Sequence, residues 1–598
     1  MARSTRGWPF CFLPWTVRRR LALDRRLSRV ILAAAVFMAI WLTLQPSHQP
    51  HLQPGAPSRV GSRPAIRFRA STFDWQSVSQ RYPAPAIRPL PTGQPKQFPP
   101  VQHVFSGYVH DTATQRRQRA VRAAFIRNWD SYKKYAWLWD ELAPVSAKGR
   151  NPFGGWAATL VDSLDTLWIM DLPDEFRQAA AAAAQLDWAN TTETAANLFE
   201  TTIRHLGGLL SAYDLSHEPA LLEKARELGD MLYMAFDTPN RMPGFWINFE
   251  DAKNGRQLAG TGDPSASPCS LSLEFTRLSQ LTGEPKFYDA ISRISDFLER
   301  TQGQSKLPGM WPKLINFNQE LVTDGGFTMG ALADSLYEYL PKMSALLGGR
   351  LPAYEKMYRA SMGTAKEHLL FRPMVSDHDK AGKQVLFVGD AVVHSETQII
   401  EHIAEGQHLS CFTGGMFGLG GKLFNIPDHL AIGERLARGC AWAYDAFPTG
   451  LMPEIFGMMP CESLDGPCPF DEKAWKKHDE EKSKEGPDSG KMPSKGFKNA
   501  RDPRYILRPE AIESIFLLYR MTGKDDLREL AWRMFESVMK ATETPLGNSA
   551  IADVTARGET TKTDSMEVRS SNATPLTSIL LIHHRRASSS LKPSSTST

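Results

Sequence analysis

Residues 197–213 read NLFETTIRHLGGLLSAY, and the rest of the chain is organised around this stretch. At 3.6 residues per turn, the segment separates into two helical faces. One face is apolar and consists of Phe199, Ile203, Leu206, Leu210 and Tyr213. The opposite face consists of Glu200, Arg204, Gly207, Gly208 and Ser211.

The polar face of this helix allows two interpretations. Glu200 and Arg204 are four residues apart, a spacing that suits a structural ion pair as well as a binding site. Each glycine costs roughly 1 kcal/mol relative to alanine inside a helix. Gly207 and Gly208 therefore indicate either close helix packing or room for a ligand.

The same combination of acidic and apolar residues recurs in three further predicted helices. They are residues 270–283 with Glu274, residues 327–343 with Asp334 and Glu338, and residues 507–523 with Arg508, Glu510 and Glu513. An isolated buried carboxylate is costly, so such groups are paired, protonated or turned towards a wet cavity.

Helical patterns dominate from about residue 105, and they recur in pairs. The polar residues Glu200, Glu274, Asp334, His408, Glu454 and Glu510 follow one another at uneven intervals of 46 to 74 residues. This irregularity excludes a regular solenoid but allows a closed ring of helical hairpins with inserted loops. Polar residues near one end of the inner helices would then line a central cavity. The charged residues 461–503 are predicted to be a solvated surface loop.

The composition is that of a large globular protein with a basic N-terminus. The chain has 598 residues, of which 42% are hydrophobic, and a net charge of +5. Much of the excess positive charge lies in arginines within residues 18–29, so nucleic-acid binding is not indicated.

Residues 30–44, VILAAAVFMAIWLTL, carry no charge and directly follow these arginines. We interpret them as a signal anchor, with residues 1–29 in the cytosol and the remainder in a lumen. A cleaved signal peptide is the alternative, but the leader is long and no small-residue cleavage pattern follows Leu44. Residues 45–104 are rich in Pro, Gln, Ser and Arg and are expected to form an extended stem.

Six cysteines are few for a disulfide scaffold. Cys411 and Cys440 lie on consecutive predicted helices and could be bridged in an oxidising lumen. Cys461 and Cys468 flank a tight loop and could pair locally, which would leave Cys269 free. The sequon at Asn190 also fits a lumenal face.

Familiar catalytic motifs are absent: the chain has no CxxC pair, no HExxH, no phosphate-binding glycine loop and no GxSxG nucleophile turn. Carboxylates, arginines, His408 and many aromatic residues remain around the expected cavity. This combination favours glycoside hydrolysis, in which one acid protonates the leaving oxygen and a second carboxylate activates water or attacks.

Seven motifs resemble the class I α-1,2-mannosidases, glycoside hydrolase family 47. They are GGWAATLVDSLDTLWIM, FETTIRHLGGLLSAY, SLSLEFTRLSQLTG, FTMGALADSLYEYL, HLSCFTGGMFGLGG, GLMPEIF and YILRPEAIESIFLLYRMTG. The resemblance covers residues 116–567 and implies an all-α (αα)7 barrel over residues 105–567. It also implies an inverting mechanism, a calcium ion, high-mannose N-glycans as substrates, and a type II membrane protein of the endoplasmic reticulum or Golgi.

The resemblance also implies roles for individual residues. Glu200 matches the acid that protonates the leaving oxygen, Asp334 and Glu510 match central carboxylates with Glu510 as the base, and Glu454 matches a further proposed proton donor. The residues that match the mannose-binding set are Arg204, Glu274, Glu338, His408, Arg508 and Glu513. Cys411 and Cys440 match the family's disulfide. Leu332 resembles the Golgi-type members and implies trimming of several mannoses.

The tail departs from the family. Residues 568–598 contain no Asp or Glu and many Ser and Thr, and none of them matches the family's terminal Thr–Glu pair, whose Thr binds calcium. No metal ligand is therefore identifiable in this chain, and we expect a frame or splice error, or a truncated allele. An impaired, lectin-like glycan-binding protein on the same barrel is the alternative function; a purely structural scaffold explains neither the recurring acids nor the anchor.

Overall fold

The computed structural model describes residues 65–105, 111–483 and 495–566. The expected anchor at residues 30–44 and the tail at residues 568–598 lie outside this range. Within the described part of the chain, no helix has both the length and the apolar character needed to cross a membrane.

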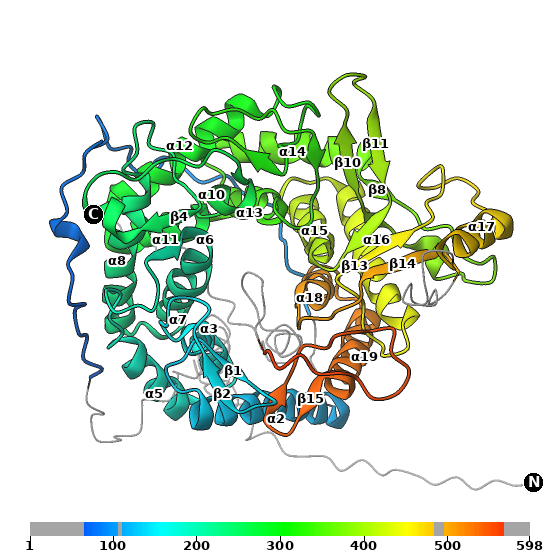
Figure 1. Cartoon of the computed structure of the whole chain (residues 1–598), viewed down its shortest axis with the longest axis horizontal. Coiled ribbons are helices and arrows are strands. Elements are labelled where there is room, and N and C mark those ends of the chain that lie inside the picture. Colours follow the sequence, from blue (N-terminus) through cyan, green and yellow to red (C-terminus); the bar gives the residue numbers. More distant parts are fainter. Residues whose placement is uncertain (1–64, 106–110, 484–494, 567–598) are drawn as a thin grey trace, which may run out of the picture. The chain divides into compact units, whose positions relative to one another are not determined.

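Residues 66–566 form a ring of helices in two layers (Figure 1). The inner layer consists of α4 (Leu164–Ile169), α7 (Gly207–Ser216), α11 (Ser272–Thr282), α13 (Asp334–Leu346), α15 (Thr413–Leu423) and α18 (Glu510–Thr522). The outer layer consists of α2 (Thr112–Tyr135), α5 (Pro173–Ala183), α8 (Pro219–Tyr233), α12 (Pro285–Thr301), α14 (Pro352–His368), α16 (Pro427–Ala446) and α19 (Asp525–Thr542).

Each inner helix packs against the outer helix that follows it, from α4 with α5 to α18 with α19, which gives six described hairpins. Outer helix α2 stands between α19 and α5, to which it is joined by Arg117–Glu529 and Lys133–Glu175 ion pairs. Among the described residues, no inner helix pairs with α2. The described chain therefore forms a helical ring, as expected, with six hairpins of an inner and an outer helix.

Proline residues mark the starts of many helices, and glycine residues mark the ends of some. Five outer helices begin at a proline, a residue that suits the first helical turn because its missing N–H has no partner there in any case. Gly283 and Gly523 end α11 and α18 with positive φ angles of 74° and 72°, the conformation that favours glycine after a helix. These short inner-to-outer turns all lie at one end of the ring, because every outer helix returns the chain in the opposite direction.

The other end of the ring carries the long outer-to-inner connections, which contain short strands and short helices. The paired strands are β1 (Glu141–Ala143) with β2 (Lys148–Arg150), β3 (Ala195–Asn197) with β4 (Trp246–Asn248), β5 (Asp263–Pro264) with β6 (Leu314–Ile315), β8 (Leu370–Phe371) with β9 (Phe387–Val388), and β15 (Glu543–Thr544) with β16 (Gly547–Asn548). Two sheets have three strands: β11 (Ile400–Ile403), β10 (Asp390–Val393) and β7 (Gly326–Phe327), and β12 (Glu405–Gln407), β13 (Ile455–Met458) and β14 (Phe497–Asp502). All described pairs are antiparallel. The short helices of these connections are α3 (Ala158–Asp162), η4 (Met234–Phe236), α9 (Phe249–Lys253), α10 (Ala266–Cys269), η5 (Gly382–Gln384) and η6 (Leu409–Phe412), while η2 (Trp75–Ser77) lies in the segment before α2.

Two sequence-based expectations about single elements need correction. The segment 197–213 is not one uniform α-helix: α6 (Leu198–Glu200) leads into a π-helical turn, η3 (Thr201–Leu206), before α7 begins. The segment 461–503 is not only a loop, because it contains α17 (Glu472–Ser483) and β14, which extends the sheet beside β13. Short-range charge patterns did not reveal that β14 pairs with a strand about 40 residues earlier.

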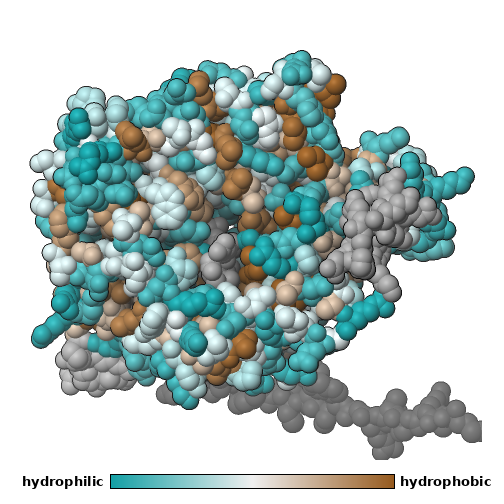
Figure 2. All heavy atoms as spheres, viewed as in Figure 1, coloured by the Kyte–Doolittle hydropathy of each residue, from teal (hydrophilic) through white to brown (hydrophobic). Residues whose placement is uncertain are grey.

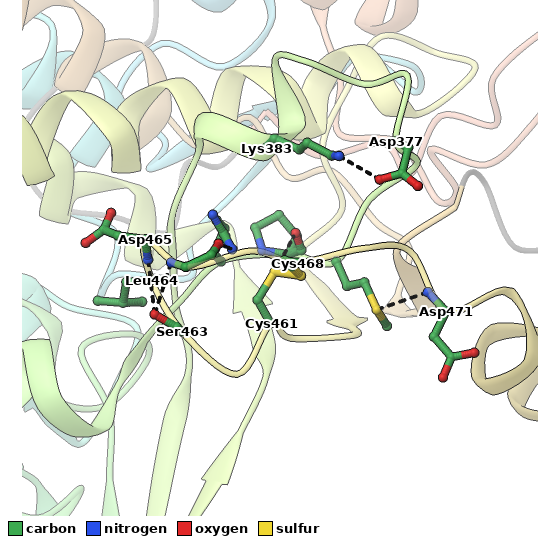
Figure 3. Close-up of a disulfide and its surroundings, with 12 residues drawn as sticks. Asp377, Lys383, Cys461, Ser463, Leu464, Asp465, Cys468 and Asp471 are labelled. Atoms are coloured by element: carbon green, nitrogen blue, oxygen red, sulfur yellow. Dashed lines mark hydrogen bonds and ion pairs between the residues drawn. A yellow bond between two sulfur atoms is a disulfide. The ribbon is translucent and has the colours of Figure 1, made fainter.

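Both expected disulfides are present. Cys411 in η6 is bonded to Cys440 in α16, and Cys461 is bonded to Cys468 across a seven-residue separation. Figure 3 shows the second bridge, whose loop is further held by the Ser463 hydroxyl, which accepts the backbone N–H groups of Asp465 and Gly466. Cys269 is free and buried.

Residues 66–105 run along the outer layer in mostly irregular conformation. Their backbone N–H groups bind barrel acceptors at successive points: Thr72 to Asp187, Arg81 to Asp237, Arg88 to Asp289, Lys96 to Gly348 and His103 to Arg520. Trp75 is only 4% exposed. Part of the segment expected to be a stem is thus attached to the ring.

The face shown in Figure 2 is mainly hydrophilic and neutral, with separate hydrophobic areas, some of them beside the central hollow. The apolar core lies between the two helix layers and is continuous around the ring.

Candidate active site

Three of the predicted catalytic acids lie at the N-terminal ends of inner helical segments. Glu200 ends the short helix α6, whose first turn is capped by Asn197, and Asp334 and Glu510 are the first residues of α13 and α18. Because the inner helices run in the same direction, these ends gather at the long-loop end of the ring. Free N–H groups and the helix dipole favour negative charge at such positions.

Glu200 forms the centre of one half of the site. Arg204 Nε donates to Glu200 Oε2 at 2.9 Å, and Arg204 Nη1 lies 3.5 Å from Asp162 Oδ2 in α3. The guanidinium is 6% exposed and lies 4.2 Å from the ring centre of Phe153. The spacing of four residues therefore produces an ion pair between a buried arginine and a half-buried glutamate, and Asp162 adds a second carboxylate that sequence reasoning did not assign to the site.

The two glycines after Glu200 have different environments. A Cβ atom on Gly208 would lie 2.9 Å from the carbonyl oxygen of Val161, so this glycine permits close packing against α3. A Cβ on Gly207 would lie in ordinary contact, 3.7 Å from Glu274 Cγ. Helix packing explains Gly208, and Gly207 brings Glu274 to the same face of the helix as Glu200.

Glu274, Glu338 and Glu513 surround a lysine that the sequence analysis did not single out. Lys342 donates to Glu338 one turn earlier on α13, and its positive charge also acts on Glu274 and Glu513. Tyr339 donates to Glu274 Oε1 at 2.8 Å. The spacing Asp334, Glu338, Lys342 follows one face of a helix, so this pattern could have identified Lys342.

Glu510 and Glu454 form the other half of the site with a buried arginine and histidine. Arg508 Nε donates to Glu454 Oε2 at 2.6 Å, and His408 Nδ1 lies 3.7 Å from Glu510 Oε2. The other histidine nitrogen, Nε2, is 2.8 Å from the hydroxyl of Tyr444. Glu510 is 5% exposed, yet neither of its carboxylate oxygens has a hydrogen-bond partner among the described residues.

Burial raises the pKa of several of these acids. Desolvation raises the pKa of Asp334 to about 7, and the charges of Glu338 and Glu510 act in the same direction. Desolvation likewise raises the pKa of Glu274 to about 7, that of Glu513 to about 8 and that of Asp162 to about 7. Burial alone would lower the pKa of Arg508, but the Glu454 and Glu510 carboxylates outweigh it and the pKa is raised.

The structure thus places all ten predicted site residues on the inner helices or on the loops beside their N-termini. Direct contacts or electrostatic interactions connect Asp334, Glu338, Glu454, Arg508, Glu510, Glu513, Lys342, Glu274 and His408. Glu200 and Arg204 precede Gly207 on the same helical segment, and a Cβ atom on Gly207 would lie 3.7 Å from Glu274 Cγ. Sequence reasoning missed Lys342, Asp162, Tyr339, Tyr444 and also Tyr505, whose ring centroid lies 5.7 Å from that of His408. The tyrosines carry no local signal because long-range packing brings them in.

The described residues do not fit a calcium ion held directly by side chains. Among residues 65–105, 111–483 and 495–566, no three His, Cys, Asp or Glu side chains are arranged to hold a metal ion. Calcium takes six to eight oxygen ligands. In this site, carboxylates pair instead with three separate cations, Arg508, Lys342 and Arg204.

A cavity of about 140 Å³ lies beside the acids, between α2, α3, α18 and α19. Its wall includes Phe125 and Trp129 of α2, Ile512 of α18, Val538 of α19, and Met566. Arg204 and Asp162 connect this cavity to the site. The cavity thus faces α2, the outer helix that has no inner partner among the described residues.

Comparisons with known proteins agree with this geometry. Residues 124–569 match the model of glycosyl hydrolase family 47. A mannosyl-oligosaccharide α-1,2-mannosidase from Coccidioides posadasii is 34% identical over 471 residues, which cover 76% of this chain and 83% of that protein. The enzyme of the same name from Penicillium citrinum is 32% identical over 473 residues, which cover 76% and 84%. The solved α-1,2-mannosidase from Trichoderma reesei superposes with a TM-score of 0.68 at 29% identity and covers 79% of this chain and 94% of that one.

Proposed function

Because the chain belongs to glycosyl hydrolase family 47, we propose that its central cavity removes terminal α-1,2-linked mannose from high-mannose N-glycans by an inverting reaction. The chain is a glycoside hydrolase, and α-1,2-mannosidase activity is the activity for which its relatives are named. The observation that carries the proposal is the set of carboxylates gathered at the N-terminal ends of inner helices.

Glu510 is the residue that we propose as the base. Its two carboxylate oxygens lack hydrogen-bond partners among the described residues although the side chain is buried. Unpaired acceptors in a buried site are costly unless a ligand or water satisfies them. A water bound here would transfer a proton to Glu510 as its oxygen attacks the anomeric carbon.

Glu200 is the residue that we propose as the acid, acting directly or through a water. When its proton moves to the leaving oxygen, the carboxylate that remains is stabilised by Arg204 at 2.9 Å. Glu454 is an alternative donor; it is paired with Arg508 as Glu200 is with Arg204, but its side chain is 8% exposed against 29% for Glu200, which is thus more accessible to a substrate or water. Asp334, Glu274, Glu338 and Glu513 are proposed to bind the hydroxyl groups of the reacting mannose. Because several of these acids have raised pKa values, they can donate as well as accept hydrogen bonds near neutral pH.

Calcium, organelle and membrane topology belong to the same proposal. The family resemblance implies calcium, but the described residues do not supply a direct ligand set, so no step is assigned to the ion. The Arg-rich residues 1–29 and the apolar residues 30–44 support a type II protein of the Golgi or endoplasmic reticulum. The sequon at Asn190 supports a lumenal catalytic domain, and the exposed Leu332 supports trimming of several mannoses.

The decisive experiment uses proton NMR to follow hydrolysis of a high-mannose glycan by the purified full chain. An inverting enzyme must release mannose first as the β anomer, because one displacement at the anomeric carbon inverts its configuration. Initial release of the α anomer would reject inversion. Glycan binding without mannose release would favour the lectin-like alternative.

A further inference from the structure

Trp246 is unusually exposed for a tryptophan in a paired strand. Its side chain is 53% exposed, while most of the large aromatic residues of this chain are buried between the helix layers. The indole contacts Phe245 edge-on, with 5.4 Å between ring centroids. One supported ring with an accessible face is the arrangement in which an aromatic side chain can bind a ligand by stacking.

The backbone that carries Trp246 is firmly held. Trp246 pairs with Asn197 across the β3–β4 ladder, and its carbonyl oxygen accepts a hydrogen bond from Gln257 Nε2 at 2.7 Å. Beside this pair, the backbone N–H of Leu198 donates a hydrogen bond to the carbonyl oxygen of Phe245, with an N···O distance of 3.1 Å. A fixed backbone lowers the entropy cost of presenting the ring to a ligand.

The same ladder relates Trp246 to the proposed acid. Asn197, its cross-strand partner, caps α6 by accepting the backbone N–H of Glu200. Paired antiparallel residues lie about 5 Å apart, and three helical residues add about 5 Å. Trp246 is therefore roughly 10 Å from Glu200 along the backbone, at the long-loop end of the ring.

Two further exposed apolar side chains lie on the connected loops. Leu258 is 63% exposed and follows Gln257, the residue that binds the Trp246 carbonyl. Leu332 is 45% exposed and keeps a positive φ of 82°, which is costly for a branched side chain. Its carbonyl accepts the N–H of Ala266 and the hydroxyl of Ser265, so two hydrogen bonds hold this strained residue.

We propose that Trp246, with Leu258 beside it, forms a stacking platform for mannose units that lie behind the scissile linkage. The proposal rests on the proposed function, because that function places a branched glycan at this end of the ring. A pyranose ring has an apolar C–H face that suits an indole, and its hydroxyl edge stays in water. Binding energy gained away from the reacting sugar would favour large glycans over short ones.

The test compares Trp246→Ala and Trp246→Phe with the unchanged full chain on two substrates. One substrate is a high-mannose glycan and the other is α-1,2-mannobiose, which is too short to extend far from the cleaved linkage. We expect Trp246→Ala to lower kcat/KM about tenfold for the glycan, mainly through KM, and to leave mannobiose unaffected. Trp246→Phe should retain most of the activity on the glycan.

Trp168→Ala is the matched control. Trp168 is 42% exposed, but it lies near the C-terminal end of inner helix α4 and packs edge-on against Phe176 of α5. This variant should leave both substrates unaffected. Equal losses on both substrates, or no loss on the glycan, would overturn the platform.

Calorimetric titration separates this inference from the proposed function. If the unchanged chain hydrolyses neither substrate, the proposed function fails, and the dissociation constant of the glycan then decides the platform. Weaker glycan binding by Trp246→Ala but not by Trp168→Ala would support it. Equal glycan affinities, or no binding to the unchanged chain, would reject it.

Discussion

At the residue scale, the site is dominated by the competition between desolvation and charge pairing. Asp334, Glu274 and Glu513 are acids whose pKa is raised by burial, while Arg508 and Lys342 keep their positive charges because carboxylates surround them. For these acids, desolvation changes the pKa more than the nearby positive charges do, because two cations are shared among a larger number of carboxyl groups. Acids with strongly raised pKa values beside cations that stay charged are typical of catalytic sites.

Glu200→Gln should abolish turnover and preserve binding, because the amide keeps the volume of the side chain but cannot donate the acid proton. We expect kcat to fall by roughly 10²- to 10⁴-fold, with little change in the dissociation constant of the glycan. Mannose release and calorimetry measure the two quantities. Glu193→Gln, an exposed substitution in the preceding loop, is the control. A Glu200→Gln variant with a near-normal rate would show that Glu200 is not the acid.

Glu274→Gln should change how stability depends on pH. The folded-state pKa of Glu274 is about 7, above its usual value of 4.5, because burial disfavours the carboxylate. The contribution of protonated Glu274 to the stability of the fold is therefore fully present below about pH 4.5 and is lost as the pH rises through about 7. Gln stays neutral and can still accept from Tyr339. Between pH 4.5 and 8, the free energy of unfolding of the variant should therefore rise by about 3 kcal/mol relative to that of the unchanged chain.

Denaturant unfolding at several pH values measures the effect of Glu274→Gln. Glu367→Gln, at a glutamate whose side chain is 74% exposed, should follow the unchanged chain at every pH. A constant difference between Glu274→Gln and the unchanged chain would show that Glu274 titrates normally in the folded state.

Local patterns predict residues of the site only where they share a helix face. Glu200 with Arg204, and Asp334 with Glu338, follow from helical spacing alone. Their burial and the approach of His408 to Glu510 depend on contacts between residues far apart in the chain. The family resemblance supplied that information, and without it the choice between a structural ion pair and a catalytic site stayed open.

At the scale of elements, helix starts and ends were more predictable than the connections. Prolines mark the first turns of five outer helices, and glycines mark the ends of α11 and α18. The strands were not predicted, because each is two to six residues long and pairs with a distant partner. The π-helical turn after Glu200 was also missed, since no propensity marks it; such turns often accompany functional sites.

The Cys411–Cys440 disulfide connects η6 to α16, next to His408. Cys411→Ser should destabilise the fold by roughly 2–5 kcal/mol, because the bridge closes a loop of about 30 residues. Denaturant unfolding under non-reducing conditions measures this loss. Cys468→Ser, which opens a bridge of sequence separation 7, should cost less. Two free thiols at Cys411 and Cys440 in mass spectra of the non-reduced protein would contradict the assignment.

At the scale of the whole molecule, the ring places every proposed acid at one end and leaves one wall different from the others. Six inner helices follow one another from α4 to α18. Between α18 and α4 no inner helix is described, and the cavity of about 140 Å³ faces α2 at this place. Phe125 and Trp129 of α2 line this cavity. In the six hairpins, an inner helix packs against the outer helix instead. Arg204 lies at the edge of the cavity, so this wall contributes to the position of the proposed acid Glu200.

The residues after Met566, which itself lines this cavity, are those in which the chain departs from the family. We expect the chain as written to bind calcium weakly and to turn over slowly, because residues 568–598 contain no match to the family's calcium-binding threonine. A chimera that continues after Glu567 with the C-terminal segment of the Penicillium citrinum relative should cover the α2 wall with an apolar helix. It should melt several degrees higher, bind calcium more tightly and hydrolyse the glycan faster.

The rate difference should be on the order of 10²-fold, the cost of a small misplacement of catalytic groups. Calcium titration, thermal melting and mannose release with and without a chelator measure the three effects. A chain that stops after Glu567 is the control and should behave like the chain as written, because residues 568–598 contain no match to the family's calcium-binding threonine. If the chain as written trims mannose as fast as the chimera and a chelator stops it, the calcium site is complete without the family's C-terminal segment, and the open wall has no functional consequence.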